Sequence, residues 1–299
     1  MANTGHKDRL FKFIFGNPDH KEWTLSLYNA LNGTSYSNPE DIEFNTLEDV
    51  IYMGMKNDVS FIIMDAVNLW EHQSTFNPNM PIRFFIYAGH LYEKHISSIR
   101  FSRFSGRLQK LPKPKCICFY NGKDEQPEER ILRLSEAYGS GDGDIEVSVK
   151  MLNINYGRNM SLMKSCMMLE GYALLIASIR RNQRVMKNLD VAIDAAIDEM
   201  PNEFELKKFL LTHRAEVKGM YLTEYDEEKE RELLREEFRE EGFEEGREEG
   251  RMEGISDTNK RVASDMLKKH LPLTLIEEIS QLSEEVIRTI ADRLGITVA

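Results

Sequence analysis

One short stretch, residues 56 to 75, limits the possible folds of this chain more than any other. It reads KNDVSFIIMDAVNLWEHQST, with the apolar runs VSFIIM and VNLW on either side of a turn. Apolar runs of this length joined by a tight turn are typical of a β-hairpin. A turn centred between Met64 and Asp65 makes paired residue numbers add up to 129, so that Asp58 faces Glu71. Opposed side chains on one face of such a pair lie about 4.5–5.5 Å apart at Cβ, which predicts two converging carboxylates.

Two like charges in this arrangement destabilise a sheet unless a cation lies between them. Carboxylates with added waters suit Mg²⁺, or alternatively Mn²⁺, so Asp58 and Glu71 are candidate metal ligands and catalytic residues. The two-residue period of a strand places Gln73 on the face of Glu71 and turns the side chain of His72 away. The alternative is an exposed sheet edge that binds nothing, because a one-residue shift in register moves Asp58 to the other face.

Helical and strand patterns follow one another along the chain and predict an α/β (α+β) fold, with a mixed sheet flanked by helices and then an all-helical C-terminal region. A helix up to about Ser97 is indicated by one face that carries Ile82, Phe85, Ile86, Gly89 and Tyr92. Helices are also expected at residues 7–31, with a break at 16–18, and at 161–183, 186–199 and 203–220, followed by a polar helix from Glu227. Further strands are expected at residues 115–122 and 145–154. Residues 42–53 fit either a strand or a strand followed by a helical turn.

This pattern predicts four segments: a core at 1–160, a helical extension packing on it at 161–222, a charged helix at 223–254 and a small helical module at 255–299. The capping-box pattern of Thr274 with Glu277 and a second helix start at Ser283 describe the module. Its two short helices resemble a helix-turn-helix in spacing, but Glu284 and Glu285 begin the second helix, where phosphate contacts are made. A packing module is therefore favoured over DNA recognition.

Charge is distributed unevenly along the chain. Of the net charge of −11, the segment from Glu224 to Gly254 contributes −9, from 15 acidic and 6 basic residues. Residues 94–118, by contrast, hold seven Lys or Arg and no Asp or Glu. Such a patch neutralises phosphates, and the candidate DNA-binding residues are Arg100, Arg103, Arg107 and Lys110. The alternative is a solvated basic loop.

Four glycines recur every fourth residue within the acidic segment, at Gly242, Gly246, Gly250 and Gly254. A glycine inside a helix costs roughly 1 kcal/mol relative to alanine, so four on one stripe require an explanation. Close approach of two helices predicts a homo-oligomer through residues 227–254, with Glu and Arg paired across the contact. A flexible charged linker is the alternative.

Several classes of protein are not indicated. The N-terminus lacks the apolar core of a signal peptide, and the longest apolar segment, residues 166–179, contains Glu170 and is too short to span a bilayer, so a cytoplasmic protein without membrane contact is expected. Three cysteines form no disulfide framework and, with the scattered histidines, no zinc motif. They are expected to be ordinary buried thiols.

These motifs together resemble one enzyme family. KDRLFKFIFGNP is similar to a D-x-x-F-K opening helix, EHQST followed by RFFIYAGHLY to an E-x-Q strand with an R-x-x-x-Y helix, and CICFYNGK to the next strand. The glycine-spaced helix and EEISQLSEEVI are similar to the family's ending. The chain thus resembles the PD-(D/E)XK nuclease superfamily, in particular its recombination-promoting nuclease (Rpn) and transposase-like branch.

This resemblance implies roles for individual residues. Asp58 and Glu71 correspond to metal ligands, the backbone carbonyl of His72 to a third, and Gln73 occupies the position of the superfamily's lysine. Gln is usual in this branch, although an amide cannot act as a base, and the proline that usually precedes the aspartate is absent here. Lys12, Arg83 and Tyr87 match supporting positions, with ordinary helix packing as the alternative.

The favoured hypothesis is a Mg²⁺-dependent endonuclease that hydrolyses phosphodiester bonds of DNA, with a link to recombination or mobile elements. The alternative is a catalytically weak nuclease-like protein that acts as an oligomeric DNA-binding or regulatory partner. A strand-transferring transposase ranks lower, because no separate triad of acidic residues is apparent.

Overall fold

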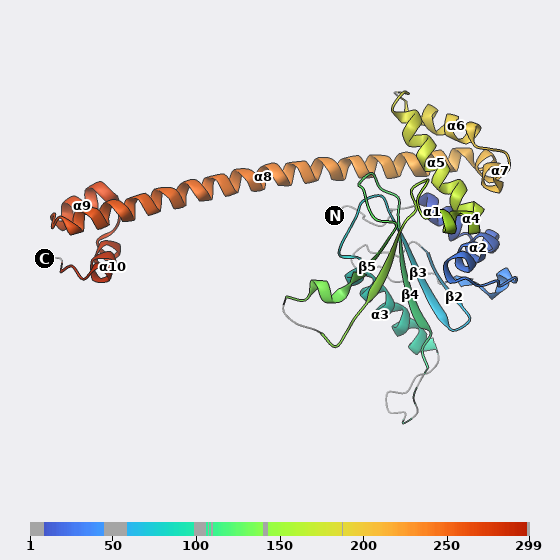
Figure 1. The fold of residues 1–299 in the computed structure, drawn as a ribbon, viewed down its shortest axis with the longest axis horizontal. Helices are drawn as coiled ribbons and strands as arrows, with labels where there is room; N and C mark the ends of the chain where they lie inside the picture. The colour runs from blue at the N-terminus through green and yellow to red at the C-terminus, as the bar shows by residue number, and fades with distance from the viewer. Residues whose placement is uncertain are drawn as a thin grey trace. The chain divides into compact units, whose positions relative to one another are not determined.

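The computed structural model describes residues 9–44, 59–98, 106, 108, 110–139, 143–186 and 188–297. The chain divides into two compact units, one up to Asp226 and one from Glu227 (Figure 1). All described strands lie in the first unit, and the second unit is helical in its described part. The mixed α/β sheet followed by a helical C-terminal region is therefore as expected from the sequence.

The first unit is built on a six-stranded mixed sheet with the order β1-β2-β3-β4-β6-β5. Strands β3, β4 and β6 run parallel, and the other neighbouring pairs are antiparallel. The bounds are β1 Glu43–Phe44, β2 Val59–Ile63, β3 Ala66–Gln73, β4 Lys113–Tyr120, β5 Glu129–Arg133 and β6 Ser148–Asn153.

The hairpin between β2 and β3 has the predicted register. Val59 pairs with Trp70, and Ile63 pairs with Ala66. Met64 takes a left-handed conformation in the turn, with φ of 53°. Strand β3 extends further than the sequence pattern suggests, and all eight of its residues are buried.

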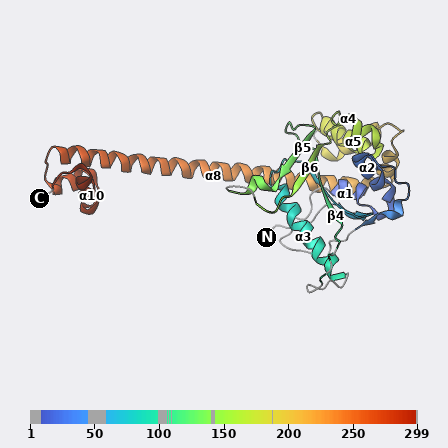
Figure 2. The same ribbon diagram turned by 60° about the horizontal axis from the view of Figure 1, so that its bottom comes forward.

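Helices cover both faces of the sheet, as Figures 1 and 2 show for α3 on one side and α4 and α5 on the other. One core joins α1, α2, α5, α6 and α7 to side chains such as Trp70 and Phe119, and the other joins α3 to Leu69, Tyr120 and Met151. Within the first unit the bounds are α1 Arg9–Phe15, α2 Lys21–Asn32, α3 Met80–Ser98, α4 Met160–Ser165, α5 Met167–Gln183, α6 Leu189–Glu199 and α7 Glu205–Thr212. Gly33 caps α2 in the left-handed conformation, as its Asn-Gly ending predicts.

The helix face predicted for α3 is wrong. Ile82 and Phe85 are 38% and 42% exposed, whereas Met80, Phe84 and Tyr87 are buried against the sheet. Both sets recur at helical spacing, so periodicity alone does not separate them. The structure shows the second set packed against the sheet, where it shares a core with Leu69 and Cys118.

Helix α8 spans Arg214–Lys268 without interruption, although the sequence pattern suggested separate helices with a break after residue 220. All four glycines of the stripe lie inside it, with no atom outside the helix within 4 Å of a Cβ added at any of them. Its last residues, including Ala263 and Leu267, form a small core with α9 Leu273–Ser280 and α10 Glu284–Leu294. Among the described residues, none of the helices is long and apolar enough to cross a membrane.

The capping box predicted at Thr274 is wrong. Pro272 is the residue that precedes α9, and Thr274 lies inside the helix. The Oε1 atom of Glu277 instead accepts a hydrogen bond from the backbone N–H of Glu284, at 3.1 Å, across the turn. The predicted start of the last helix after Ser283 is confirmed.

An ionic ladder joins α6 to the first turns of α8 within the first unit. Lys218 Nζ lies 2.7 Å from the carboxylates of both Asp190 and Asp194, while Arg214 pairs with Asp194 at 3.1 Å and also with Asp198. The hydrogen bond from Lys218 is the main cause that lowers the pKa of Asp194, and the hydrogen bonds from Arg214 lower the pKa of Asp198.

The ladder should make stability depend on acid. A carboxyl whose pKa is lowered by folding stabilises the protein above its unfolded pKa of about 3.9, and this contribution is lost as the pH falls through the folded pKa. In urea unfolding between about pH 6 and pH 2, we expect the wild type to lose more stability than a variant with both Arg214→Met and Lys218→Met. The exposed Lys164→Met should retain the wild-type dependence; parallel curves for all three proteins would contradict the assignment.

Candidate functional site

The end of β3 buries a carboxylate on the face that α3 covers. The Glu71 side chain is only 2% exposed, and its Oε2 atom accepts a hydrogen bond from Arg83 Nη2 at 3.1 Å. Burial of a charged carboxylate is unfavourable unless a cation and hydrogen bonds compensate. Arg83 supplies such compensation from the first turns of α3.

Tyr87 holds Arg83 in place. It lies one helical turn further along α3, and its hydroxyl accepts hydrogen bonds from Arg83 Nε at 3.2 Å and from Nη2 at 2.8 Å. The guanidinium also lies 5.8 Å from the centre of the tyrosine ring. The four-residue spacing of these two residues puts them on one helix face, so the structure brings both to Glu71.

Gln73 lies on the same face, two residues after Glu71. It is buried, and its Nε2 donates to the sulfur of Met80 at the start of α3. Its Oε1 atom is also buried and has no hydrogen-bond partner among the residues that the structure describes. A buried carbonyl oxygen without a partner is costly. The Gln73 oxygen is therefore free to accept a hydrogen bond or to bind a metal ion.

His72 points to the opposite face, as the strand alternation predicts. Its ring lies 5.2 Å from Phe11 in a stacked arrangement, and its Nε2 is hydrogen-bonded to the Tyr172 hydroxyl at 3.0 Å. The Gln73 carbonyl accepts a hydrogen bond from the N–H of Asn121, the residue after β4, at 2.8 Å. Since successive carbonyls of a strand alternate in direction, the His72 carbonyl is directed away from β4, toward the β2 side.

Asp58 lies outside the described residues, as do Arg100, Arg103 and Arg107. The register of β2 and β3 is the one from which pairing of Asp58 with Glu71 was predicted, and that pairing stays a prediction.

Lys12 is exposed on α1, near the start of β2. Its Cγ and the Cγ2 of Val59 each lie 3.3 Å from where a Cβ on Gly16 would be. Lys12 has no hydrogen bond or ion pair to Glu71 or Gln73 among the described residues, and it belongs to the α1 side of the sheet, opposite Glu71. The structure thus places Lys12 beside the start of β2.

The described end of the basic patch lies far from Glu71. Lys110 is exposed, and Lys113 pairs in register with Ala66, at the opposite end of β3. Glu71 pairs with Cys118, five residues along β4 from Lys113, which corresponds to about 17 Å of strand. The basic side chains there therefore lie well away from the carboxylate.

An arginine that the sequence did not single out secures the ends of the parallel strands. Arg180 on α5 donates through Nη1 to Asn121 Oδ1 at 2.8 Å and to Asn155 Oδ1 at 3.1 Å. These contacts join residues that follow β4 and β6 to a helix 59 positions away from Asn121. Only the Asn-Gly pair after β4 marks this place in the sequence, as a strand end.

The three cysteines are free thiols. Cys118 and Cys166 are buried and Cys116 is half-buried, and none forms a disulfide. Burial raises the pKa of the Cys116 thiol to about 12 and also raises that of Cys166.

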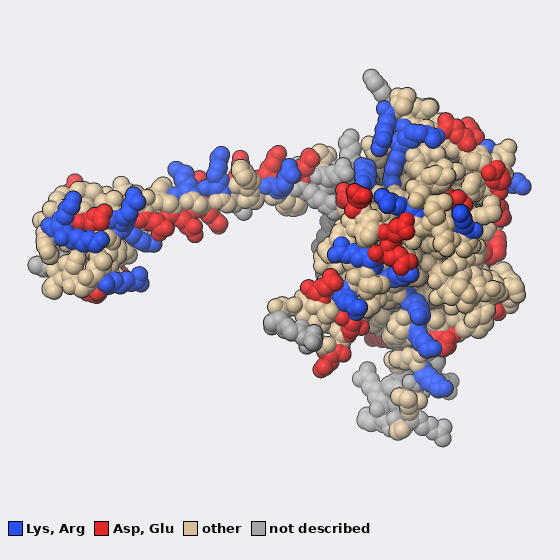
Figure 3. Space-filling model, in the orientation of Figure 1, with Lys and Arg blue, Asp and Glu red and all other residues tan. Residues whose placement is uncertain are grey.

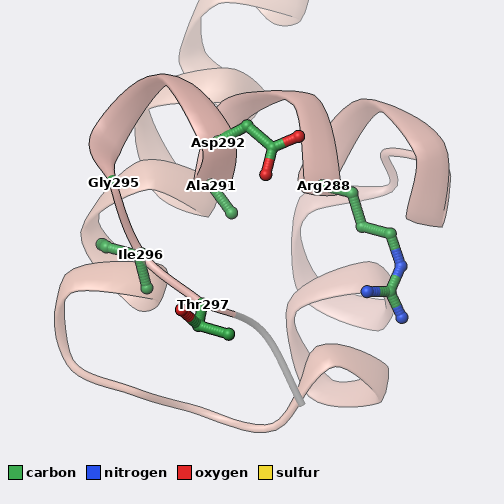
Figure 4. A pocket seen from close by; sticks show the side chains of 6 residues that line it. All are labelled: Arg288, Ala291, Asp292, Gly295, Ile296 and Thr297. Carbon is green, nitrogen blue, oxygen red and sulfur yellow. The ribbon is translucent and has the colours of Figure 1, made fainter.

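The second unit contains a hollow of its own. It has a volume of about 540 Å³ and lies at the end of α10, with Arg288 and Asp292 as its only charged lining residues among those described (Figure 4). At the other end of α10, Glu284 and Glu285 begin the helix. A helix that starts with two carboxylates repels phosphate, which supports a packing role for this unit.

The metal-binding capacity of the site depends on Asp58. Within the described ranges, no group of three or more His, Cys, Asp or Glu residues could hold a metal ion. Glu71, the unused amide oxygen of Gln73 and the His72 carbonyl are all hard oxygen donors, the type that Mg²⁺ prefers. This donor set fits a divalent cation once a second carboxylate joins it.

Comparison with family models, with curated proteins and with solved structures finds no match for this chain.

Loss of Arg83 should destabilise the fold strongly. In EDTA, Arg83→Met removes the guanidinium that pairs with the buried Glu71 carboxylate, which should cost about 3–5 kcal/mol, and adding Glu71→Gln should recover a large part. The matched control is Arg181→Met, which breaks an exposed pair with Glu199 and should cost at most about 1 kcal/mol. Urea unfolding measures all of these; an Arg83→Met cost no larger than that of the control would contradict the role of the pair.

Proposed function

We propose that the protein is a Mg²⁺-dependent endonuclease that cleaves DNA by phosphodiester hydrolysis. One observation carries the proposal. The buried carboxylate of Glu71 and the buried Oε1 atom of Gln73, which has no hydrogen-bond partner among the described residues, lie on the same face of β3. The hairpin register next to them supports the predicted approach of Asp58. The arrangement of helix, hairpin, helix and parallel strand is compatible with the PD-(D/E)XK fold, which we include in the proposal.

Each proposed ligand has a defined part. Asp58, Glu71 and the His72 carbonyl hold the ion, and the Gln73 oxygen faces the same side of the sheet as Glu71. Bound Mg²⁺, or Mn²⁺ in its place, would polarise the scissile phosphate and lower the pKa of an attacking water. Gln73 orients by hydrogen bonding and does not accept the proton, because an amide has no basic group.

Arg83 and Tyr87 act as positioning residues. The hydrogen bond from Arg83 occupies Oε2 of Glu71 and fixes the carboxylate, while Tyr87 fixes the guanidinium. A carboxylate with a fixed orientation is pre-organised for an ion, which reduces the cost of binding. Lys12 supports the start of β2 from the α1 side.

DNA would be held at some distance from the cleaved bond. Arg100, Arg103, Arg107 and Lys110 belong to the segment that leads into β4, and exposed Lys113 and Lys115 follow. Because Lys113 at the start of β4 lies about 17 Å along the strand from the level of Glu71, it and the nearby Lys110 would contact phosphates several base pairs away. Such contacts set affinity and orientation and take no part in the chemical step.

The second candidate function is an oligomeric DNA-binding or regulatory protein of weak catalytic activity. It is favoured by α8, on which Phe238 and Phe243 are 68% and 72% exposed and Met252 is 57% exposed. Both signs of charge are distributed along this helix (Figure 3), so a second copy could pair with it through Glu and Arg as well as through the glycine stripe. Self-association through residues 227–254 belongs to this proposal and is compatible with the nuclease.

Nicking of supercoiled plasmid tests the enzyme. With Mg²⁺ or Mn²⁺ we expect relaxed and linear products, and none with EDTA. Asp58→Ala and Glu71→Gln should each lower the rate by more than the roughly 10- to 100-fold that loss of a supporting residue costs. The exposed Glu93→Gln should retain full activity; wild type as inactive as both variants, with DNA still bound, would leave only the second candidate.

Sedimentation at several concentrations tests the helix contact. Replacement of Gly246 and Gly250 with Ala improves helix propensity by roughly 1 kcal/mol each but adds methyl groups to a close approach. We expect an oligomer for the wild type and weaker association for this variant, while Gly219→Ala, earlier in α8, should associate normally. A wild type that is monomeric throughout would remove the contact.

A further inference from the structure

A large cavity lies on the α1 side of the first unit, and Lys12 and Gly16 are among the residues that line it. Its volume is about 840 Å³, and α1, α7, the first turns of α8 and the short 3₁₀ helix Pro18–His20 contribute its walls. Its basic and aromatic side chains are Arg9, Lys12, Phe13, His20, Phe209 and His213, and two carboxylates, Asp19 and Glu216, also line it. This volume is in the range of sites that enclose a small organic ligand.

Aromatic rings form one wall of the cavity. The Phe209 ring lies 5.1 Å from Phe13, 5.4 Å from His20 and 4.5 Å from His213. His20 in turn stacks on buried Trp23 at 3.8 Å, which fixes its ring. A rigid group of ring faces at a cavity wall is suited to stacking against a flat aromatic ligand.

Basic and imidazole groups supply the polar part. Arg9 and Lys12 lie three residues apart on α1 and therefore on one face of this helix. The Nδ1 atoms of His20 and His213 are 3.0 Å and 2.8 Å from carboxylates of Glu22 and Glu216. These contacts orient both rings and leave each Nε2 without a hydrogen-bond partner in the part of the chain that the structure describes.

The cavity also adjoins the end of the sheet where the proposed site lies. Gly16 is one of its lining residues. A Cβ atom placed on Gly16 would lie only 3.3 Å from Cγ2 of Val59, the first residue of β2. Val59 pairs with Trp70, the neighbour of Glu71. A strand of nucleic acid that passes around the β2 end of the sheet could therefore reach both places.

We propose that this cavity binds an unpaired nucleotide of the nucleic-acid substrate. Its base stacks on the ring of Phe13 or His213, and its phosphate contacts Arg9 and Lys12. A nucleotide matches the cavity because it combines a flat aromatic base with an anionic phosphate. The cavity likewise combines a wall of aromatic rings with basic side chains of α1. The inference rests on the proposed nuclease function and adds that the bound DNA is locally single-stranded.

Fluorescence anisotropy of a labelled oligothymidine of about 12 nucleotides tests the cavity. The full chain is titrated in EDTA, so that no cleavage takes place. Phe13→Leu keeps apolar volume but removes the ring face, and we expect Kd to rise about tenfold. Lys12→Gln should lower the slope of log Kd against log salt by about 1, since one phosphate contact is lost.

Matched controls separate the cavity from general effects. Phe85→Leu and Lys164→Gln change an exposed phenylalanine and an exposed lysine elsewhere in the first unit, and both should bind like wild type. Thermal unfolding checks each variant, and His213→Ala replaces Phe13→Leu if the latter does not fold. Unchanged Kd in both Phe13→Leu and His213→Ala, or equal losses in the controls, would overturn the proposal.

The two proposals can fail separately. If the oligothymidine binds and Phe13→Leu weakens it while plasmid is never nicked, the cavity stands and the nuclease function falls. If plasmid is nicked with Asp58 and Glu71 required, but the cavity variants bind and cleave like wild type, the reverse holds. A duplex of the same sequence that competes as well as the single strand would also overturn the preference for an unpaired nucleotide.

Discussion

Burial of β3 on both faces is the constraint on which the first unit depends. Eight consecutive buried residues require a layer of helices on each side, and a polar side chain of the strand that lacks a partner is costly. Glu71 and Gln73 meet α3, whereas His72 meets α1 and α5 through Phe11 and Tyr172. The polar end of the strand thus fixes the helices around it as much as the apolar part does.

The same arrangement explains why chemistry would be located at this end. Parallel strands β3, β4 and β6 finish together here, and Arg180 secures the loops that follow β4 and β6. Rigid strand ends hold functional groups more accurately than loops do, while the opposite end carries exposed lysines suited to less specific contact. The cavity on the α1 side adds a third element close to the start of β2.

The hairpin could be predicted from the sequence because two apolar runs are symmetric about one turn, which determines the register of β2 and β3. The buried face of α3 could not, since Ile82 and Phe85 repeat as regularly as Phe84 and Tyr87 and only the sheet distinguishes them. Strand β5 was not predicted, because Leu132 alone among its five residues is buried, as at many sheet edges. A resemblance singled out Arg83 as a supporting residue, but its contact with Glu71 was not predicted. The contact of Arg180 with Asn121 had no local signal.

The buried cysteines have a practical consequence. A thiol reacts with alkylating reagents only as the thiolate, and a pKa raised to about 12 at Cys116 leaves almost none at neutral pH. Cys166 is shifted in the same direction, and Cys118 is fully enclosed by the sheet and α3. Maleimide dyes should therefore not react with the native chain. One cysteine introduced on its surface would then be a selective attachment site for a spectroscopic label.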